Sequence, residues 1–329
     1  MPAFLRLEEY RLPDVFYPGD SCRYAENTVR QFDRWCRELT HLSPQAREQV
    51  VSMEMGYATV HCHPHSTSPE RALACALHLL WTTLFDDYFG ICEPTRLTRT
   101  QDRVVSILRG SPEQPTDHPL VHKVAQLRDL CLSLAPPGWF DRYIRSVEGY
   151  FYKGLTTESA LRRERRIPTF AELERFRPHT IVQIPYQRMV EIELNLGLPE
   201  DIITHPVIAR AEHLVARLAA WQNDAFSLMK ELARPAEVGD VINLALVLQH
   251  ERGLTLEDAC TAMLEVYTAD VQELLHLYEH LPSFGQHQEA VRNYVRHLAY
   301  TVSGLETWYL AHGSARYLPD GNWVDEYAP

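Results

Sequence analysis

The sequence predicts an all-α protein. Apolar residues recur at spacings of three and four in most of the long segments, for instance at Leu73, Leu77, Leu80 and Leu84. This is the period of a helix that buries one face. Sustained alternation of apolar and polar residues, the pattern of a half-buried strand, is hard to find. We therefore expect an α-helical bundle with a central apolar cavity between facing helices.

Proline-rich stretches divide the helical pattern into segments. They are short enough to be connections between helices, and none has the composition of a flexible interdomain linker. The chain also has no internal repeat and no low-complexity tract. We expect a single domain over residues 1–329, with roughly ten to twelve helices. The interruptions fall at residues 61–70, 110–119, 134–139, 165–170 and 281–285.

The composition is that of an ordinary globular protein and narrows the classes of function. The 329 residues are 45% hydrophobic and 23% charged, with a formal net charge of −12 and a pI near 5.7. Such a chain lacks the broad basic surface that grips nucleic-acid phosphates, so we expect no nucleic-acid partner. Any anionic ligand must instead meet a local basic pocket.

The N-terminal residues and the cysteines indicate a cytoplasmic protein. Glu8, Glu9 and Arg11 lie where a signal peptide would carry its apolar run. No stretch reaches the roughly 18–20 apolar residues of a membrane span. The seven cysteines are odd in number, scattered and without CxxC spacing, which is typical of a reducing compartment.

Two adjacent carboxylates, Asp86 and Asp87, end an apolar helical segment directly after Phe85. Hard cations such as Mg²⁺ take carboxylate oxygens and are typically held by one or two carboxylates together with substrate phosphates. Most acid pairs at helix ends are solvated or act as caps, so the pair alone is a weak signal. It is a candidate metal site in which Asp86 would be the primary ligand.

A second candidate motif spans residues 223–231, with the sequence Asn-Asp-Ala-Phe-Ser-Leu-Met-Lys-Glu. Asn223, Ser227 and Glu231 recur at every fourth residue, so they drift only about 40° per step and line one stripe of a helix. An amide oxygen, a hydroxyl and a carboxylate suit an octahedral Mg²⁺, and Lys230 adds a cation for a phosphate. The alternative is the polar face of an ordinary surface helix, but apolar neighbours indicate that the stripe faces inward.

Together the two motifs resemble those of the class I terpene synthase family, specifically its bacterial branch. In that family an aspartate-rich motif and an Asn-Asp-x-x-Ser-x-x-Lys-Glu motif lie on opposite walls of a pocket and hold three Mg²⁺ ions. The match at residues 223–231 is full, which implies that this stripe chelates one Mg²⁺ and that Asp86 binds the other two. The first motif departs from the family form, because Phe89 and Gly90 replace its usual third acid, with Glu93 a remote substitute.

The resemblance also implies which groups bind a diphosphate, whose departure requires cations and donors aimed at its oxygens. Arg177, upstream of the second motif, corresponds to the diphosphate-sensing arginine of the family. Thr180 and Ile181 correspond to the helix break that places a backbone carbonyl near the reacting carbon. Arg316 and Tyr317 match the Arg-Tyr pair that closes over the diphosphate.

A carbocation needs apolar walls and aromatic faces that exclude water. Phe85 adjoins the acid pair, Trp81 lies one helical turn earlier, and Trp308 lies shortly before the Arg-Tyr pair. We expect these three residues to line the substrate pocket, although core packing is the usual role of aromatic residues at helical spacing. Gly304 also fits the family spacing. The segment 239–243 resembles the family as well, but it is equally well explained as a helix cap, and we expect no catalytic role there.

Two other groups of residues have the composition of a metal site. The run at 61–65, His-Cys-His-Pro-His, suggests zinc, but alternation through a proline gives poor tetrahedral geometry and no second ligand group is evident, so zinc is not expected. Two Glu-x-x-His pairs, Glu38/His41 and Glu273/His276, are the pattern of a di-iron carboxylate bundle. That hypothesis leaves both motifs and the arginines unexplained.

The sequence thus predicts an Mg²⁺-dependent class I terpene synthase that ionises a linear isoprenoid diphosphate and forms a cyclic terpene hydrocarbon or alcohol. For this family and this length of protein, farnesyl diphosphate is the favoured substrate and geranylgeranyl diphosphate the second. The volume of the pocket sets which chain length is accepted, and the sequence does not reveal that volume. A chain-elongating prenyl diphosphate transferase shares the metal and the substrate class but carries two aspartate-rich motifs. A non-catalytic helical scaffold would release no diphosphate at any Mg²⁺ concentration. Assembly as a homodimer is left open.

Overall fold

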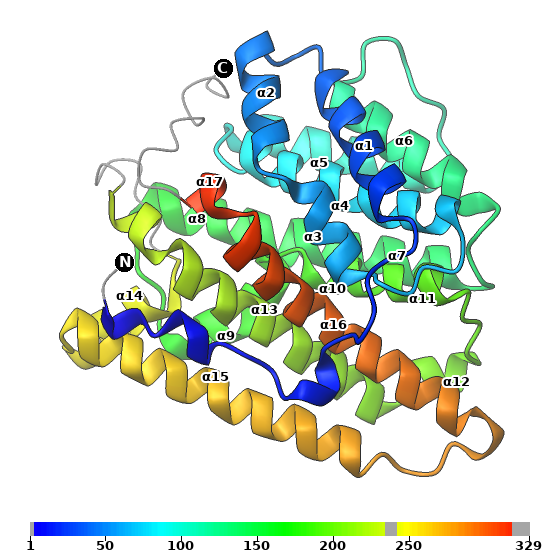
Figure 1. The fold of residues 1–329 in the computed structure, drawn as a ribbon. Helices are drawn as coiled ribbons and strands as arrows, with labels where there is room; N and C mark the ends of the chain where they lie inside the picture. Colours follow the sequence, from blue (N-terminus) through cyan, green and yellow to red (C-terminus); the bar gives the residue numbers. More distant parts are fainter. Residues whose placement is uncertain (1–2, 234–241, 318–329) are drawn as a thin grey trace.

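The computed structural model describes residues 3–233 and 242–317, and it confirms the all-α prediction (Figure 1). No strand occurs in these two ranges. Each predicted proline-rich interruption contains a junction between two helices. The helical segments nevertheless run from α1 to α17, more than the roughly ten to twelve expected. Most of the excess comes from four segments of only four to six residues, α10, α11, α12 and α17.

Prolines begin several helices of the N-terminal half. Pro44, Pro69, Pro94 and Pro119 each lie in a first turn, where the missing N–H removes no hydrogen bond and the ring presets φ. The elements of this half are η1 (Ala3–Leu5), η2 (Leu7–Glu9), η3 (Asp14–Phe16), α1 (Ala25–Arg37), α2 (Pro44–Ser52), α3 (Met55–Cys62), α4 (Pro69–Phe89), α5 (Pro94–Leu108), α6 (Pro119–Leu132), α7 (Trp139–Glu148), the π-helical η4 (Gly149–Leu155) and α8 (Thr156–Glu164).

Longer helices dominate the C-terminal half. Thr169 and Glu172 form a complete capping box at the start of α9, so two of its orphan backbone donors are satisfied. The elements are α9 (Phe170–Thr180), α10 (Gln183–Gln187), α11 (Met189–Leu194), α12 (Glu200–Ile203), α13 (Pro206–Ala233), α14 (Leu244–Arg252), α15 (Leu256–Glu279), η5 (Gly285–His287), α16 (Gln288–Ala311) and α17 (Ser314–Tyr317).

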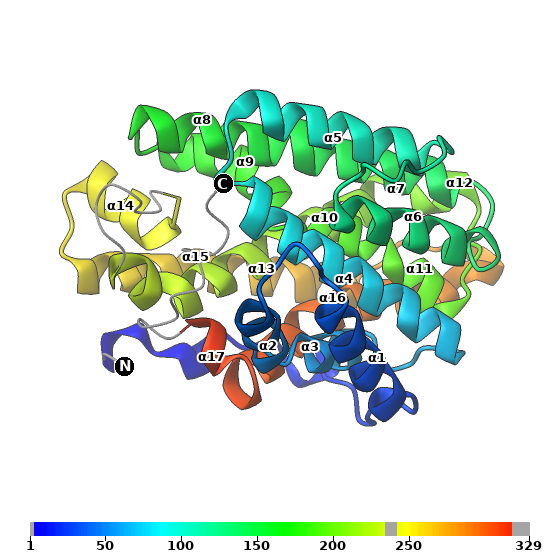
Figure 2. The same cartoon turned by 90° about the horizontal axis from the view of Figure 1, so that it is seen from above.

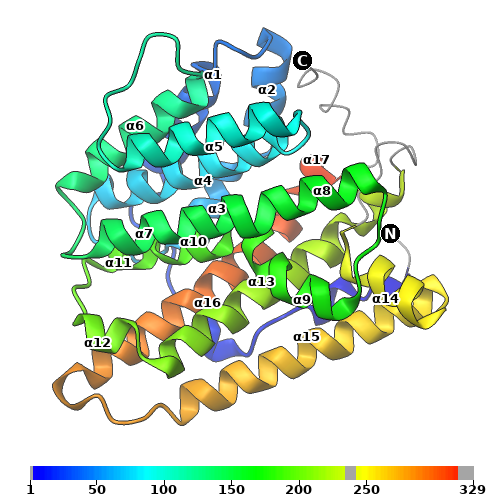
Figure 3. The ribbon, with the colours of Figure 1, turned by 180° about the vertical axis from the view of Figure 1, so that it is seen from behind.

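Helices α4 and α13 run through the middle of the molecule. Seen from above, α5, α8 and α9 lie on one side of them and α1, α2, α16 and α17 on the other (Figure 2). From behind, α7, η4 and α8 form one continuous rod that passes the end of α9 (Figure 3). The two central helices therefore face each other across an interior that the outer helices enclose.

Two clusters of buried apolar side chains hold the helices together. One is built mainly on α1 to α7, and the other on α9 and α13 to α16 together with the N-terminal segment. Helices α3 and α16 approach so closely that a Cβ at Gly304 would lie 2.5 Å from the backbone nitrogen of Cys62, which explains the glycine. Within the described ranges, no helix combines the length and the apolar character that crossing a bilayer requires.

Candidate active site

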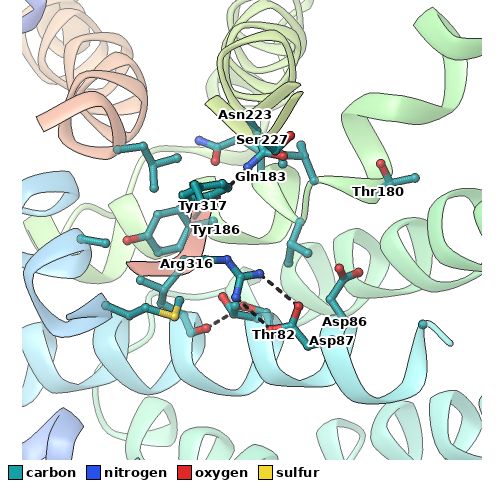
Figure 4. A pocket seen from close by; sticks show the side chains of 18 of the residues that line it. Thr82, Asp86, Asp87, Thr180, Gln183, Tyr186, Asn223, Ser227, Arg316 and Tyr317 are labelled. Atoms are coloured by element: carbon teal, nitrogen blue, oxygen red, sulfur yellow. Dashed lines mark hydrogen bonds and ion pairs between the residues drawn. The ribbon is translucent and has the colours of Figure 1, made fainter. Parts of the chain in front are cut away.

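A pocket between α4 and α13 collects most of the predicted site residues (Figure 4). Asp86 and Asp87 project from α4, while Asn223 and Ser227 project from α13 on the opposite side. The C-terminal helix α17 lies between the two walls. The predicted residues that line the pocket are Asp86, Asp87, Arg177, Thr180, Ile181, Asn223, Ser227, Lys230, Glu231, Trp308, Arg316 and Tyr317.

Trp81 and Phe85 do not line the pocket, and this corrects the expectation. Both side chains are 0% exposed, and Phe85 packs against Phe89 and Phe151 with ring centroids 4.7 and 5.0 Å apart. On a helix, Phe85 is offset from Asp86 by about 100° and Trp81 by about 140°. The face that carries Asp86 therefore points into the pocket while this aromatic stripe points into the core.

Asp86 lies in a strongly acidic environment on the pocket wall. The hydroxyl of Tyr150 donates a hydrogen bond to its Oδ1 at 3.2 Å. Burial, together with the neighbouring carboxylates of Glu158 and Asp87, raises the pKa of Asp86 to about 8. Such crowding of carboxylates is costly unless a cation occupies the space between them, so the arrangement favours a metal ligand.

Glu158 is a pocket carboxylate that the sequence analysis missed. It lies on α8, lines the pocket, and is one of the groups that raise the pKa of Asp86. Arg162, one turn later, donates a hydrogen bond to Glu158 at 2.6 Å and another to the carbonyl of Gly90 at 3.0 Å. A third acid is thus present beside the acid pair, although it comes from a different helix rather than from Glu93.

The stripe on α13 is held in place by side chains from other elements. Ser227 donates to Oε1 of Glu231 at 2.5 Å, so two of the predicted ligands lie in direct contact. Asn223 donates through Nδ2 to the hydroxyls of Tyr309 and Tyr317, at 3.0 and 3.1 Å. The amide is thereby oriented, with its oxygen turned away from the tyrosines.

Asn243 holds the other carboxylate oxygen of Glu231 in place. Its Nδ2 donates to Oε2 of Glu231 at 2.7 Å and to the backbone carbonyl of Asp224 at 2.8 Å. Its Oδ1 accepts from the backbone of Ala245, so the same residue caps α14, as the sequence suggested. Gly239 and Asp240 of that segment lie outside the described residues.

Arg177 is buried, with 7% of its surface exposed, at the end of α9. It donates to Oδ1 of Asp224 through Nε at 3.2 Å and through a terminal nitrogen at 2.5 Å, and to Oδ1 of Asn223 at 3.3 Å. Burial alone lowers the pKa of Arg177, but the carboxylates of Asp224 and Glu158 outweigh it and raise that pKa. The guanidinium therefore stays charged and fixed beside the metal stripe.

Helix α9 ends at Thr180, three residues after Arg177, and the backbone turns before α10 begins at Gln183. Val182 adopts φ 62°, a left-handed conformation that is strained for a β-branched residue. Gly154 of η4 permits this arrangement, because a Cβ there would lie 2.8 Å from the carbonyl carbon of His179. Strain of this kind at a pocket wall is typical of functional sites, and it lies at the helix break that the sequence predicts at Thr180 and Ile181.

The C-terminal Arg316 and Tyr317 reach both walls. Arg316 donates to the two oxygens of Asp87 at 3.0 Å each, and Tyr317 accepts from Asn223. Lys230 lies 5.5 Å from the ring centroid of Tyr317, a cation–π distance. The cations expected around a diphosphate thus lie in the same pocket as the acids.

Acidic and basic side chains are equal in number among the residues that line the described pocket. Four acids, Asp86, Asp87, Glu158 and Glu231, face four bases, Arg162, Arg177, Lys230 and Arg316. A bound diphosphate would add several negative charges, so additional cations are needed to hold it. The candidate ligands are oxygen atoms of carboxylate, amide and hydroxyl groups, which suit Mg²⁺. The residues present therefore fit a divalent metal site.

The di-iron hypothesis is wrong, because neither Glu-x-x-His pair faces a shared interior site. Glu38 is exposed and accepts a hydrogen bond from Lys123 at 2.8 Å. Glu273 is exposed and accepts two hydrogen bonds from Arg210 at 2.6 Å each.

Comparisons with known proteins agree with this geometry. The model of terpene synthase family 2, C-terminal metal binding, matches residues 78–273. The chain is 30% identical over 303 residues to 10-epi-cubebol synthase of Sorangium cellulosum, covering 90% of this chain and 91% of that protein. It is 27% identical over 294 residues to sesquiterpene synthase 1 of Postia placenta, covering 87% and 83%. A crystal structure of α-eudesmol synthase shares the fold, with a TM-score of 0.77 and 21% identity over 92% of this chain and 99% of that one.

The fold and the pocket define an all-helical protein whose central pocket carries acidic and basic side chains on facing walls. The chain belongs to the terpene synthase family. It is a class I enzyme of that family, whose substrates are prenyl diphosphates and whose matched region is the metal-binding domain. The non-catalytic scaffold considered from the sequence is thereby excluded.

Proposed function

We propose that the protein converts farnesyl diphosphate into a cyclic sesquiterpene with Mg²⁺ as its cofactor. The observation that carries the proposal is the placement of Asp86 and Asp87 on one wall of the pocket and of the stripe from Asn223 to Glu231 on the other (Figure 4). The C15 chain length is supported by relatives that are named sesquiterpene synthases. Geranylgeranyl diphosphate is the second candidate.

We propose three Mg²⁺ ions, with Asp86 and Asp87 as ligands on α4 and Asn223, Ser227 and Glu231 on α13. Bound Mg²⁺ acts as a Lewis acid that neutralises the charge developing on the leaving diphosphate. Glu158, together with Asp86 and Asp87, would orient a metal ion or its bound water on the α4 side of the pocket. The excess of oxygen ligands on both walls supports this assignment.

The protein's own cations would bind the diphosphate and follow its charge as the carbon–oxygen bond breaks. Arg177 is held in place by Asp224 and by the hydroxyl of Thr180, so its guanidinium is already oriented in the pocket before a diphosphate binds. Arg316 and Tyr317 would close the pocket from the C-terminal side, and Lys230 would add a further charge. Together these groups make the diphosphate a better leaving group and keep it in place afterwards.

The remaining wall would shield the allylic cation from water. Trp308 lies on this wall and is held by hydrogen bonds from its Nε1 to the carbonyls of Met53 and Glu54, both at 3.1 Å. Tyr186 and Tyr309 also line the pocket and offer aromatic faces to a cation, although the sequence analysis had not named them. Ile181 supplies apolar surface at the helix break.

We also propose that the whole chain, residues 1–329, forms one domain that acts in the cytoplasm without a nucleic-acid partner. The pocket is lined by side chains of the first apolar cluster and by Ile181, which packs against the second, and this supports one folding unit. A homodimer is compatible with this proposal and is not required by the site.

The test is incubation with the C10, C15 and C20 linear diphosphates, with Mg²⁺ and with a chelator, followed by mass spectrometry of the organic extract. We expect a cyclic C15 product only with farnesyl diphosphate and Mg²⁺. A parallel incubation with isopentenyl diphosphate tests for chain elongation. Longer prenyl diphosphates in that sample, with no hydrocarbon or alcohol, would overturn the proposal in favour of a prenyltransferase.

A further inference from the structure

A second polar cluster lies outside the pocket, where the loop after α3 meets α11 and α16. Nδ1 of His65 lies 3.2 Å from Nε2 of His297, although the two residues are 232 positions apart. Nδ1 of His297 lies 3.1 Å from Oε1 of Glu193. Potential ligand atoms of these three residues all lie within 4.8 Å of one another. The second ligand group that the sequence analysis did not find for the histidine run at 61–65 is therefore present.

The spacing of the two ring nitrogens matches a pair of metal ligands. Two nitrogens at about 2.0–2.1 Å from a tetrahedral Zn²⁺ are separated by about 3.3 Å. A carboxylate beside Nδ1 of His297 favours the tautomer with its hydrogen on Nδ1, which leaves the Nε2 lone pair on the side of the ring where His65 lies. This is the carboxylate–histidine arrangement that orients many metal-binding imidazoles.

The charge of the cluster favours a bound cation. Glu193 is 0% exposed and accepts hydrogen bonds from Nδ1 of His63 and from the backbone of His65, both at 3.0 Å. A fully buried carboxylate is costly unless a positive charge compensates it. A metal ion on His65 and His297 would supply that charge.

We propose that His65 and His297 form a binding site for one divalent transition-metal ion such as Zn²⁺, with Glu193 orienting His297. Imidazole nitrogens prefer Zn²⁺, Co²⁺ or Ni²⁺ to Mg²⁺, so the site differs in metal preference from the oxygen ligands of the pocket. His65 is only partly buried, which gives an ion access and lets water complete the shell.

The site would fix the loop after α3 to α16 directly behind the pocket. His63, on the same loop, packs edge-on against Tyr186 with ring centroids 4.8 Å apart, and Tyr186 lines the pocket. A bound ion would therefore stabilise the pocket wall without contacting the substrate. The role of the ion would be structural, and its binding would raise the melting temperature of the protein.

Metal-free protein, prepared with a chelator and then held in excess Mg²⁺, can be titrated with Zn²⁺ by calorimetry. We expect one Zn²⁺ per chain and a rise in melting temperature. His65→Ala should weaken Zn²⁺ binding by more than the roughly 10- to 100-fold that loss of an outer-shell partner costs. His297→Gln should give the same loss. Co²⁺ in place of Zn²⁺ should give the visible absorption of a tetrahedral site.

His276→Ala is the matched control, because His276 and His280 form an exposed histidine pair on α15, with ring centroids 4.2 Å apart. That variant should bind Zn²⁺ as the parent protein does. Circular dichroism shows whether each variant is folded. Absence of stoichiometric Zn²⁺ binding in the parent protein, or equal binding by folded His65→Ala, would show that the cluster is only a hydrogen-bonded network.

Discussion

Arg316 and Asp87 form a two-pronged ion pair, with both terminal guanidinium nitrogens 3.0 Å from the carboxylate oxygens. The pair ties the C-terminal helix α17 to the end of α4. Tyr317, the next residue, accepts a hydrogen bond from Asn223 on α13. One dipeptide therefore contacts both candidate motifs and connects α4 to α13 across the pocket.

Loss of the Arg316 guanidinium should impair turnover. Arg316→Ala removes a cation and a bidentate donor. We expect kcat to fall by about 10²- to 10³-fold, which is the usual effect of removing one donor oriented toward the charge that develops in the transition state. Arg316→Lys keeps the charge but not the paired geometry and should recover only part of the loss. Steady-state diphosphate release measures both, with exposed Arg30 as the site of a control Arg30→Ala variant. Equal rates in Arg316→Ala and the control would contradict the assignment.

Arg177 should be needed for stability as well as for activity. Its partner Asp224 is 0% exposed and also accepts from the backbone of Leu244 at 2.8 Å. Arg177→Ala leaves this carboxylate buried without its cation, which typically costs about 3–5 kcal/mol of unfolding free energy. Urea denaturation measures the loss. Arg177→Ala with unchanged stability and unchanged kcat would show that the pair has neither role.

The raised pKa of Asp86 predicts how the metal-free protein responds to pH. The folded-state pKa of about 8 exceeds the unfolded value, so native Asp86 keeps a proton that the unfolded chain releases. Its contribution to stability is therefore complete below about pH 4 and is lost as the pH rises toward 8.

In a chelator, Asp86→Asn should flatten this part of the pH profile and make the protein more stable than the parent near pH 9. Assayed separately with Mg²⁺, the same variant should have no turnover. Thermal denaturation from pH 6 to pH 9 measures the effect. Parallel pH profiles for the parent and the variant would mean that Asp86 is not the group responsible.

Glu158 should strengthen metal binding on the α4 wall. Glu158→Gln keeps the shape and removes the charge, so we expect the Mg²⁺ concentration for half-maximal rate to rise by about 10- to 100-fold. Glu164→Gln, at the exposed end of the same helix, is the matched control. A change in kcat with an unchanged Mg²⁺ requirement would instead assign Glu158 a purely structural role.

The sequence could predict the helices and the α13 stripe because both depend on local spacing. Prolines mark most of the breaks, and Asn223, Ser227 and Glu231 lie on one helix whose geometry is known in advance. The helical angle also places Phe85 about 160° from Asp87, so one face of the helix cannot hold Phe85 and both acids.

Other features depend on which distant segments meet, and no local pattern reports this. Glu158 and Arg162 are spaced like any ion pair on a surface helix, and only the packing of α8 beside α4 brings them to the pocket. The contact of His65 with His297 likewise depends on α16 crossing α3. The strained φ of Val182 has no sequence signal, since valine rarely adopts it.

The most direct test of the account is a crystal structure with Mn²⁺ and inorganic diphosphate, using the anomalous signal of the metal. We predict metal peaks between Asp86 on α4 and the Asn223, Ser227 and Glu231 stripe on α13, with Arg177 and Arg316 on the diphosphate. Diphosphate bound without metal on both walls, or metal at a site remote from these residues, would contradict it.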